Sequence, residues 1–115
     1  MFQVNFSKQS INELNKLDKL QQMQIVDKFS SLTPESIKSS EEIGKFARNS
    51  KDFYRLKSGD YRIYFEIIDN TLYSHYMLHQ HSLTDFIFRF KLPISEEQMV
   101  EQHQSFWKYL ETLKK

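Results

Sequence analysis

Residues 53–79 read FYRLKSGDYRIYFEIIDNTLYSHYMLH, and this pattern predicts most of a β-sheet. Polar and apolar side chains alternate with a period of two over 53–58, 61–68 and 71–79, and Tyr, Phe and Ile are frequent there. Gly59-Asp60 and Asp69-Asn70 separate the three stretches, and these residue types tolerate the positive φ angles of tight hairpin turns. We therefore predict a three-stranded antiparallel meander.

Two-residue turns fix the register of the strands, and the register assigns each side chain to one face. The predicted cross-strand pairs are Lys57–Arg62, Arg55–Tyr64, Arg62–Met77, Tyr64–His75 and Glu66–Tyr73. The predicted core face is apolar and consists of Tyr54, Leu56, Ile63, Phe65, Ile67, Leu72, Tyr76 and Leu78. The other face, here called the basic face, consists of Arg55, Lys57, Arg62, Tyr64, Glu66, Tyr73 and His75. We expect the basic face to be open to solvent and to carry the function.

The segment before the meander predicts one more strand and several helices. Residues 2–6 alternate like a half-buried strand. Ser7 and Asp18 are suited to cap two helical stretches within 8–32, which form a helical hairpin or one bent helix. Thr33-Pro34-Glu35 has the cap, the proline and the acidic residue that begin a third, short helix.

The C-terminal part predicts a long helix. Ser95-Glu96-Glu97-Gln98 has the residues of a capping box, and the helix reaches about Leu113. Its apolar stripe consists of Met99, Val100, His103, Phe106, Trp107, Leu110 and Leu113. Residues 43–46 are predicted as loop. The resulting α+β fold is one domain over 1–115, with a core over 1–92 in which the N-terminal helical hairpin packs on an antiparallel β-sheet, and an appended C-terminal helix at about 95–113.

Composition narrows the class of protein. A chain of 115 residues with 15% aromatic residues can form one compact domain with a real core. The absence of Cys excludes disulfide scaffolds, thiolate zinc sites and thiol nucleophiles, and it fits a reducing cytoplasm, which is the expected location. No apolar run approaches the ~18 residues of a membrane span, so no membrane partner is expected.

The net charge of +1 conceals a local excess of positive charge. Between 43 and 62 the cations are Lys45, Arg48, Lys51, Arg55, Lys57 and Arg62, against Asp52 and Asp60. Cations interleaved with aromatic rings suit phosphate contacts and the stacking of unpaired bases. The alternative is that these cations only keep an exposed sheet face soluble.

The hairpin over residues 53–66 resembles the central hairpin of the RelE/ParE toxin superfamily. The shared pattern is Tyr-Arg-(apolar)-(basic)-x-Gly-Asp-Tyr-Arg-(apolar)-x-Tyr, and it matches from Tyr54 to Tyr64, with Phe65 at the position of the last Tyr. The resemblance implies that fold. It also implies one of two activities: RelE-type members cut messenger RNA in the ribosomal decoding site without a metal, and ParE-type members act on DNA gyrase.

By the same resemblance, Arg62 falls on the arginine that contacts the scissile phosphate, and Arg55 and Lys57 fall on two basic positions of the preceding strand. Members usually carry an Arg or His after the last strand and a Tyr or His near the chain end, where this chain has Phe86 and Phe88. The candidate catalytic residues are Arg62, Lys57, Arg55, His79 and His81, and the candidate substrate-binding residues are Tyr64, His75, Lys51, Arg48 and Arg89. His79 and His81 lack further ligands at metal spacing, so no metal and no other cofactor is expected.

The leading hypothesis is a RelE-like toxin, a ribosome-dependent, metal-independent endoribonuclease that cleaves mRNA and represses translation. Its expected partners are ribosome-bound mRNA and a cognate antitoxin. The alternatives are a catalytically inactive binding module for a protein or RNA partner, and a ParE-like gyrase inhibitor. The C-terminal helix either docks on the body of its own chain or serves a partner, including a second copy in a homodimer.

Overall fold

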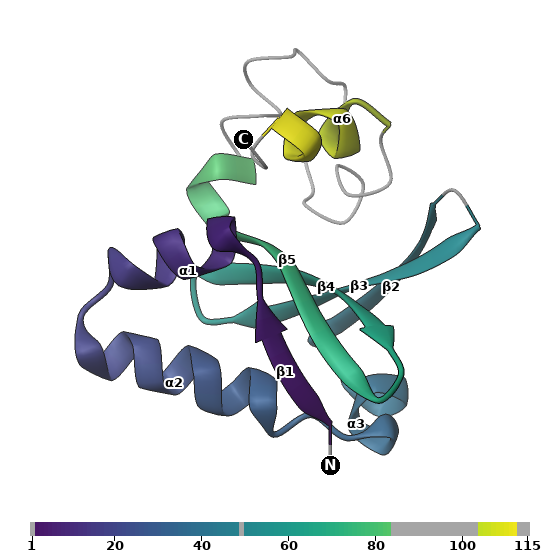
Figure 1. Cartoon of the computed structure of the whole chain (residues 1–115), viewed down its shortest axis with the longest axis horizontal. Helices are drawn as coiled ribbons and strands as arrows, with labels where there is room; N and C mark the ends of the chain where they lie inside the picture. Colours follow the sequence, from purple (N-terminus) through teal and green to yellow (C-terminus); the bar gives the residue numbers. More distant parts are fainter. Residues whose placement is uncertain (1, 49, 84–103, 113–115) are drawn as a thin grey trace.

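The computed structural model describes residues 2–48, 50–83 and 104–112, apart from the side chain of Arg48. The elements are β1 (Gln3–Phe6), α1 (Lys8–Asn15), α2 (Lys19–Ser30), α3 (Pro34–Ser39), β2 (Ile43–Arg48), β3 (Lys51–Ser58), β4 (Tyr61–Ile68), β5 (Thr71–His79) and α6 (Gln104–Thr112). The strands form a five-stranded sheet in the order β1-β5-β4-β3-β2. Helices α1 and α2 cover one face, and α6 lies over the other (Figure 1).

The sheet is mixed, which corrects the predicted antiparallel sheet at one edge. β1 pairs with β5 in parallel, from Gln3 opposite Thr71 to Phe6 opposite Ser74, and the other three pairings are antiparallel. The α+β class is confirmed. Among the described residues, no helix is long and apolar enough to cross a membrane.

The meander is confirmed at β4 and β5, whose bounds agree with the predicted strands. Gly59 has a φ of 58° at the first turn, which suits a leading glycine. Asp69 and Asn70 have φ angles of 49° and 62° at the second turn, as a turn with two left-handed residues requires. The predicted pairs Lys57–Arg62 and Arg55–Tyr64 are present.

A β-bulge in β5 changes the predicted faces. Tyr64 lies opposite Tyr76 and Phe65 lies opposite Ser74, so His75 is an extra residue in β5. Because side chains alternate with a period of two, one extra residue reverses the faces of all that follow. Tyr76 and Leu78, predicted for the core under the helices, therefore lie on the basic face, and Met77 takes a place in that core. The pair Glu66–Tyr73, before the bulge, is as predicted.

Residues 43–46 are a strand rather than the predicted loop. They belong to β2, an edge strand that pairs with β3 from Ile43 opposite Leu56 to Arg48 opposite Lys51. An edge strand receives its hydrogen bonds from one neighbour only, so its formation depends on that tertiary pairing more than on its own sequence.

The N-terminal helices begin at the predicted caps. The side chains of Ser7, Asp18 and Thr33 each accept a hydrogen bond from a backbone N–H three residues later. α1 ends at Asn15 rather than near residue 18. The core between these helices and the sheet is formed by Leu14, Ile25, Phe29, Leu32, Leu56, Ile63, Phe65, Leu72 and Met77. The ring of Phe29 lies 5.2 Å from that of Phe65, centroid to centroid.

The C-terminal helix is described over nine residues, Gln104–Thr112. The predicted start at residue 95, with Met99 and His103, lies outside the described residues, as does Leu113. Phe106, Trp107 and Leu110 are buried, and they pack with Tyr64, Tyr76, Leu78 and Leu83 in a second core on the basic face. α6 therefore docks on the body of its own chain.

Candidate functional site

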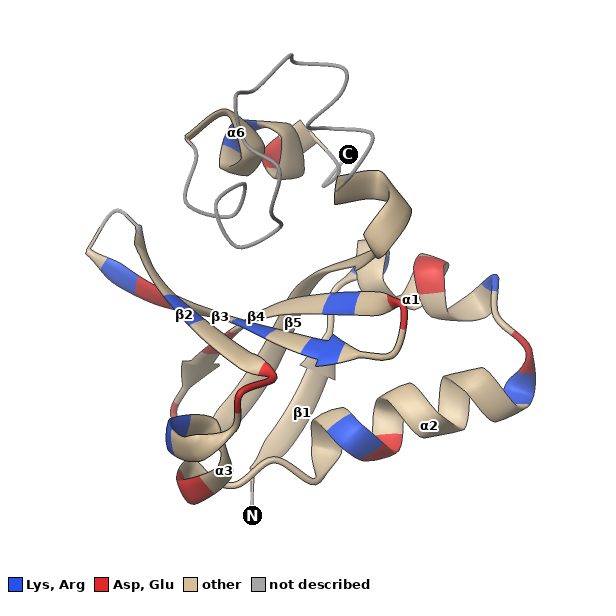
Figure 2. Ribbon diagram, turned by 180° about the vertical axis from the view of Figure 1, so that it is seen from behind, with Lys and Arg blue, Asp and Glu red and all other residues tan. Residues whose placement is uncertain are grey.

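The basic face is covered by α6, which corrects the expected open face. Its cations lie on β3 and β4, and further Lys and Arg residues lie on β2 and at the start of β3 (Figure 2). Tyr64 is 0% exposed, Arg55 is 3% exposed and Arg62 is 5% exposed. Sequence periodicity shows that a helix has an apolar side, but it does not show which surface that side will cover.

Three aromatic rings on the basic face surround Trp107, and we call Phe46, Phe53 and Tyr64 the aromatic slot. They come from β2, β3 and β4. The ring of Trp107 lies 6.2 Å from that of Phe46, 5.3 Å from Phe53 and 5.9 Å from Tyr64. Phe106 contacts Tyr64 as well, at 5.6 Å. The three rings thus come from adjacent strands and meet the indole at a tilt or edge to face.

Arg55 lies against the backbone of β2 because Gly44 has no side chain. The two residues face each other in the register. A Cβ atom placed on Gly44 would lie 2.6 Å from Nη2 of Arg55, closer than real contacts allow, and 3.0 Å from Cζ of Phe46, which is a tight contact. Gly44 therefore makes the room that lets a buried guanidinium group lie beside the aromatic slot.

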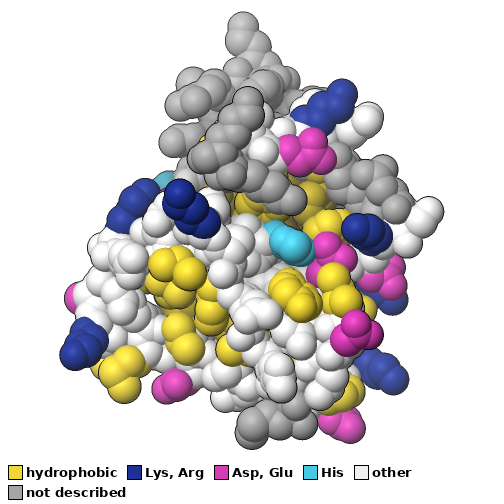
Figure 3. Space-filling view, in the orientation of Figure 1, with side chains coloured by type: hydrophobic (Ala, Val, Ile, Leu, Met, Phe, Trp, Pro, Cys, Tyr) yellow, Lys and Arg dark blue, Asp and Glu magenta, His cyan; other side chains and the backbone are white. Residues whose placement is uncertain are grey.

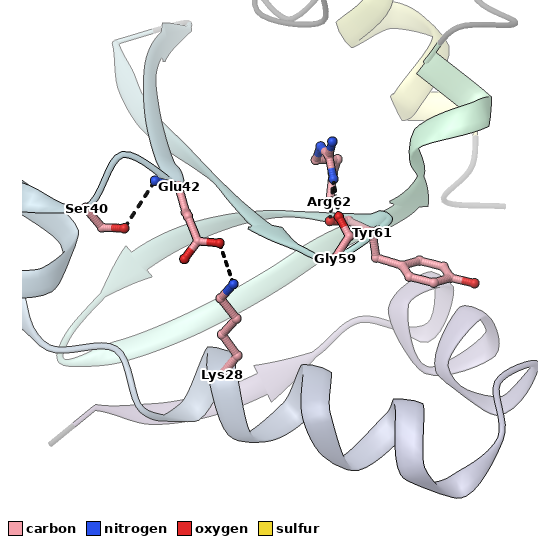
Figure 4. Close-up of polar contacts among 6 residues, drawn as sticks. All are labelled: Lys28, Ser40, Glu42, Gly59, Tyr61 and Arg62. Atoms are coloured by element: carbon pink, nitrogen blue, oxygen red, sulfur yellow. Dashed lines mark hydrogen bonds and ion pairs between the residues drawn. The ribbon is translucent and has the colours of Figure 1, made fainter.

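Arg62 holds its guanidinium group at the turn between β3 and β4. Its Nη1 donates hydrogen bonds to the carbonyl oxygens of Gly59 and Tyr61, both at 3.0 Å. Arg62 and Tyr61 point to opposite faces of the sheet (Figure 4). Lys57 lies opposite Arg62 and is half-buried, so the structure brings these two candidate catalytic residues together.

The strand that carries Lys57 is tied to α2 through Glu42. The backbone N–H of Lys57 donates to the carbonyl oxygen of Glu42 at 3.0 Å. The Glu42 carboxylate forms an ion pair with Lys28 of α2, and its backbone N–H donates to the hydroxyl of Ser40 (Figure 4). These contacts fix where the edge of the sheet begins.

His75 and Glu66 form a hydrogen-bonded pair on the basic face. Nε2 of His75 lies 2.9 Å from Oε1 of Glu66, and the two side chains are 25% and 12% exposed. His75 lies on this face as its alternation with Tyr73 predicts, next to the ring of Phe53 at 5.9 Å. The bulge adds Tyr76 to the same face. Glu66 was predicted on this face but not as a site residue.

His79 and His81 lie away from Arg62. Their rings stack at 4.7 Å, and the backbone N–H of His81 donates to Nδ1 of His79 at 3.1 Å. His79 is opposite Tyr61, and their rings are 5.0 Å apart. Because Tyr61 points to the face covered by α1 and α2, the structure does not bring this histidine pair to the basic face.

The remaining predicted site residues lie at the edge of the basic face or outside the described residues. Lys51 is exposed at the start of β3, opposite Arg48. Arg89 lies outside the described residues, as do Phe86 and Phe88. Within the described ranges, no three His, Asp or Glu side chains gather as metal ligands would. Gly44 and Phe46 were missed because their part in the face depends on the pairing of β2 with β3. Phe53 was missed although its alternation with Arg55 places it on this face.

The sheet order, the parallel edge strand and the helices on one face define the fold of the RelE toxins, so the suspected resemblance is confirmed at the level of fold. The RelE–RelB complex from Pyrococcus horikoshii OT3 matches with a TM-score of 0.58 and 20% identity, over 69% of this chain and 94% of that one. The RelB–RelE complex from Methanococcus jannaschii matches with a TM-score of 0.50 and 22% identity, over 70% and 95%. The RelBE2 complex from Mycobacterium tuberculosis matches with a TM-score of 0.50 and 19% identity, over 68% and 96%.

Comparison at the level of sequence gives no such match. No family model matches the chain. No curated protein sequence matches it significantly. The solved RelE structures are covered almost completely, whereas about three tenths of this chain is left over. The surplus is about as large as the segment that follows His79, which includes α6.

Proposed function

We propose that this chain is a RelE-type toxin that cleaves ribosome-bound mRNA without a metal and thereby represses translation. The observation that carries the proposal is the presence of two buried arginines, Arg55 and Arg62, on one sheet face of a RelE fold. Apolar residues of similar volume stabilise a core at least as well as buried charges do. Buried guanidinium groups in a small domain therefore favour a role in function.

The proposed chemistry uses the RNA as its own nucleophile. The 2′-hydroxyl attacks the neighbouring phosphate, and cations stabilise the charge of the pentacoordinate intermediate. Arg62 holds the phosphate, Arg55 adds a second cation, and Lys57, opposite Arg62, acts as a further cation or as the base. Arginine suits the first two positions because its planar group donates several hydrogen bonds to phosphate oxygens.

Proton transfer to the leaving 5′-oxygen needs an acid. His79 and His81 were the first candidates, and they would have to leave Tyr61 to reach a phosphate on Arg62. Of the three histidines in the described part of the chain, His75 is the one on the basic face, and Glu66 fixes its orientation. We therefore propose His75 as the acid, with the His79–His81 pair as the alternative.

The proposed partners are ribosome-bound mRNA and an antitoxin, as the solved neighbours from Pyrococcus horikoshii and Methanococcus jannaschii are complexes of RelE with RelB. An apolar surface fits a protein partner. Ile11, Leu20 and Met23 are 45%, 65% and 57% exposed, and hydrophobic side chains gather over α1 and α2 (Figure 3). A homodimer through α6 is less favoured, because the apolar side of α6 is already buried in its own chain.

A second candidate is a RelE-fold binding module without nuclease activity. The observation in its favour is α6 itself, whose Phe106 and Trp107 pack on the ring of Tyr64. RNA can reach this ring only if α6 moves. The nuclease proposal therefore requires α6 to be displaced on the ribosome, whereas a binding module keeps it docked.

A cell-free translation assay separates the two candidates. Purified wild-type protein, Arg62→Ala and Lys108→Ala are added, and message integrity is read on a sequencing gel. Lys108 is exposed on α6, so Lys108→Ala is the matched control for removing a cation elsewhere. Cleavage that requires ribosomes and is lost only in Arg62→Ala supports the nuclease. Intact message with folded wild-type protein contradicts it and favours the binding module.

A further inference from the structure

We infer that the aromatic slot of Phe46, Phe53 and Tyr64 is a binding site for one unpaired purine base, and that the indole of Trp107 occupies this site in the resting chain. The inference rests on the proposed function and identifies the base-binding part of the basic face. Indole and purine are both flat bicyclic rings, a six-membered ring fused to a five-membered one. A cavity that accepts one therefore suits the other in shape.

The walls of the slot fit a base. The rings of Phe46, Phe53 and Tyr64 meet the indole at 58°, 48° and 82°, so they enclose it from several sides. Contacts between aromatic side chains and unpaired bases are a main source of affinity for single-stranded nucleic acid. Three such walls on adjacent strands are held in place by the sheet.

The border of the slot has the polar groups that a nucleotide needs. Arg55 lies between Gly44 and Tyr64 in the register, next to the slot, and its guanidinium group would meet the phosphate of the bound nucleotide. On the other side, the His75–Glu66 pair contacts Phe53 and offers hydrogen bonds to the edge of a base. A purely structural docking place for α6 needs neither a buried cation nor such a pair at its border.

Trp107 can leave the slot without breaking the sheet. The walls belong to β2, β3 and β4, whose pairings involve no residue of α6. In the sequence, residues 80–103 separate α6 from the end of β5. Exchange of the indole for a base therefore leaves the pairings of β2, β3 and β4 in place.

The first test uses Trp107 as its own reporter, since it is the only tryptophan in the chain. Wild-type protein is titrated with a short single-stranded oligoadenylate, an oligouridylate and a duplex RNA of the same length, each labelled so that binding is followed by anisotropy. We expect oligoadenylate binding to shift the tryptophan emission to longer wavelength. The duplex, which offers phosphates but no free base, should bind without this shift. Binding of oligoadenylate with unchanged emission would overturn the inference.

The second test removes the resident ring. Trp107→Ala should bind oligoadenylate at least about tenfold more tightly than wild type does, because stacking of one base contributes affinity in that range. Adding Phe53→Ala should abolish the gain, and Lys108→Ala should behave as wild type. Circular dichroism checks that each variant is folded. Trp107→Phe keeps a smaller ring in the slot, so its affinity for oligoadenylate should lie between those of wild type and Trp107→Ala. If wild type does not bind measurably, binding by Trp107→Ala supports the inference, and a folded Trp107→Ala that does not bind overturns it.

The two proposals fail separately. If the protein cleaves mRNA on ribosomes but no Trp107 variant gains affinity for oligoadenylate, the base site is wrong and the nuclease proposal stands. If Trp107→Ala binds oligoadenylate tightly but no variant cleaves mRNA on ribosomes, the nuclease proposal is wrong and the base site stands.

Discussion

The ring of Trp107 in α6 lies against the ring of Phe53 in β3, with their centroids 5.3 Å apart. This contact places the C-terminal helix on the sheet face that carries Arg55, Arg62 and Tyr64, opposite the face covered by α1 and α2. The chain thus has two cores separated by the sheet. One holds the fold together, and the other closes the face to which the proposed function assigns the RNA.

Leu110→Ala should undock α6 while the rest of the chain stays folded. Leu110 is fully buried in the second core, and a buried Leu→Ala change costs about 2–5 kcal/mol. Hydrogen exchange should show lost protection in 104–112 and retained protection in β4, which is also held by the first core. Lys108→Ala on the exposed side of the same helix is the control. Equal loss of protection in both segments would mean that the two cores unfold as one unit.

Gly44→Ala should disturb Arg55 as well as stability. The new Cβ would lie 2.6 Å from the guanidinium group, so Arg55 has to move or β2 has to shift, at a cost of about 1–3 kcal/mol. Urea unfolding measures this loss, and the translation assay should show weaker cleavage. Ala47→Ser, at an exposed position of the same strand, should leave both unchanged. A Gly44→Ala protein with wild-type stability and cleavage would show that the close approach to Arg55 does not matter.

Stability should fall at alkaline pH through Tyr61. Burial raises the pKa of Tyr61 above its ordinary value of 10.0, and the charges of Glu13 and Asp60 raise it further, against a lowering by Lys16. As pH rises, the unfolded chain therefore releases this proton before the folded chain does. The contribution of Tyr61 to the free energy of unfolding is present below pH 10.0 and is lost as pH rises through the folded pKa. Urea unfolding between about pH 9 and 11 should show a shallower decline for Tyr61→Phe than for wild type. Tyr73→Phe, on the other face, is the control, and an equal decline in all three proteins would contradict the assignment.

Local sequence was enough for the elements whose signals are local. β4 and β5 follow from alternation and from turn residues with positive φ, and the caps at Ser7, Asp18 and Thr33 are also local. The hairpin motif over 53–66 was sufficient to identify the fold.

Features that depend on distant contacts were not predictable in the same way. The bulge at His75 involves no glycine or other local signal, yet it moves Tyr76 and Leu78 to the opposite face. The strand at 43–46 exists because β3 pairs with it. The burial of Tyr64 depends on where an amphipathic helix docks, which its own periodicity does not specify.

The chemistry of the cut RNA ends distinguishes attack by the 2′-hydroxyl from other routes of cleavage. Messages from ribosomes incubated with wild-type protein and with Arg62→Ala are isolated, and their new 3′ ends are sequenced after treatments that distinguish a 2′,3′-cyclic phosphate from a free hydroxyl. Attack by the RNA's own 2′-hydroxyl on a phosphate held by Arg62 predicts cyclic phosphate ends with wild type, and their loss with folded Arg62→Ala. Ends with a free 3′-hydroxyl, or equal cleavage by both proteins, would contradict the account.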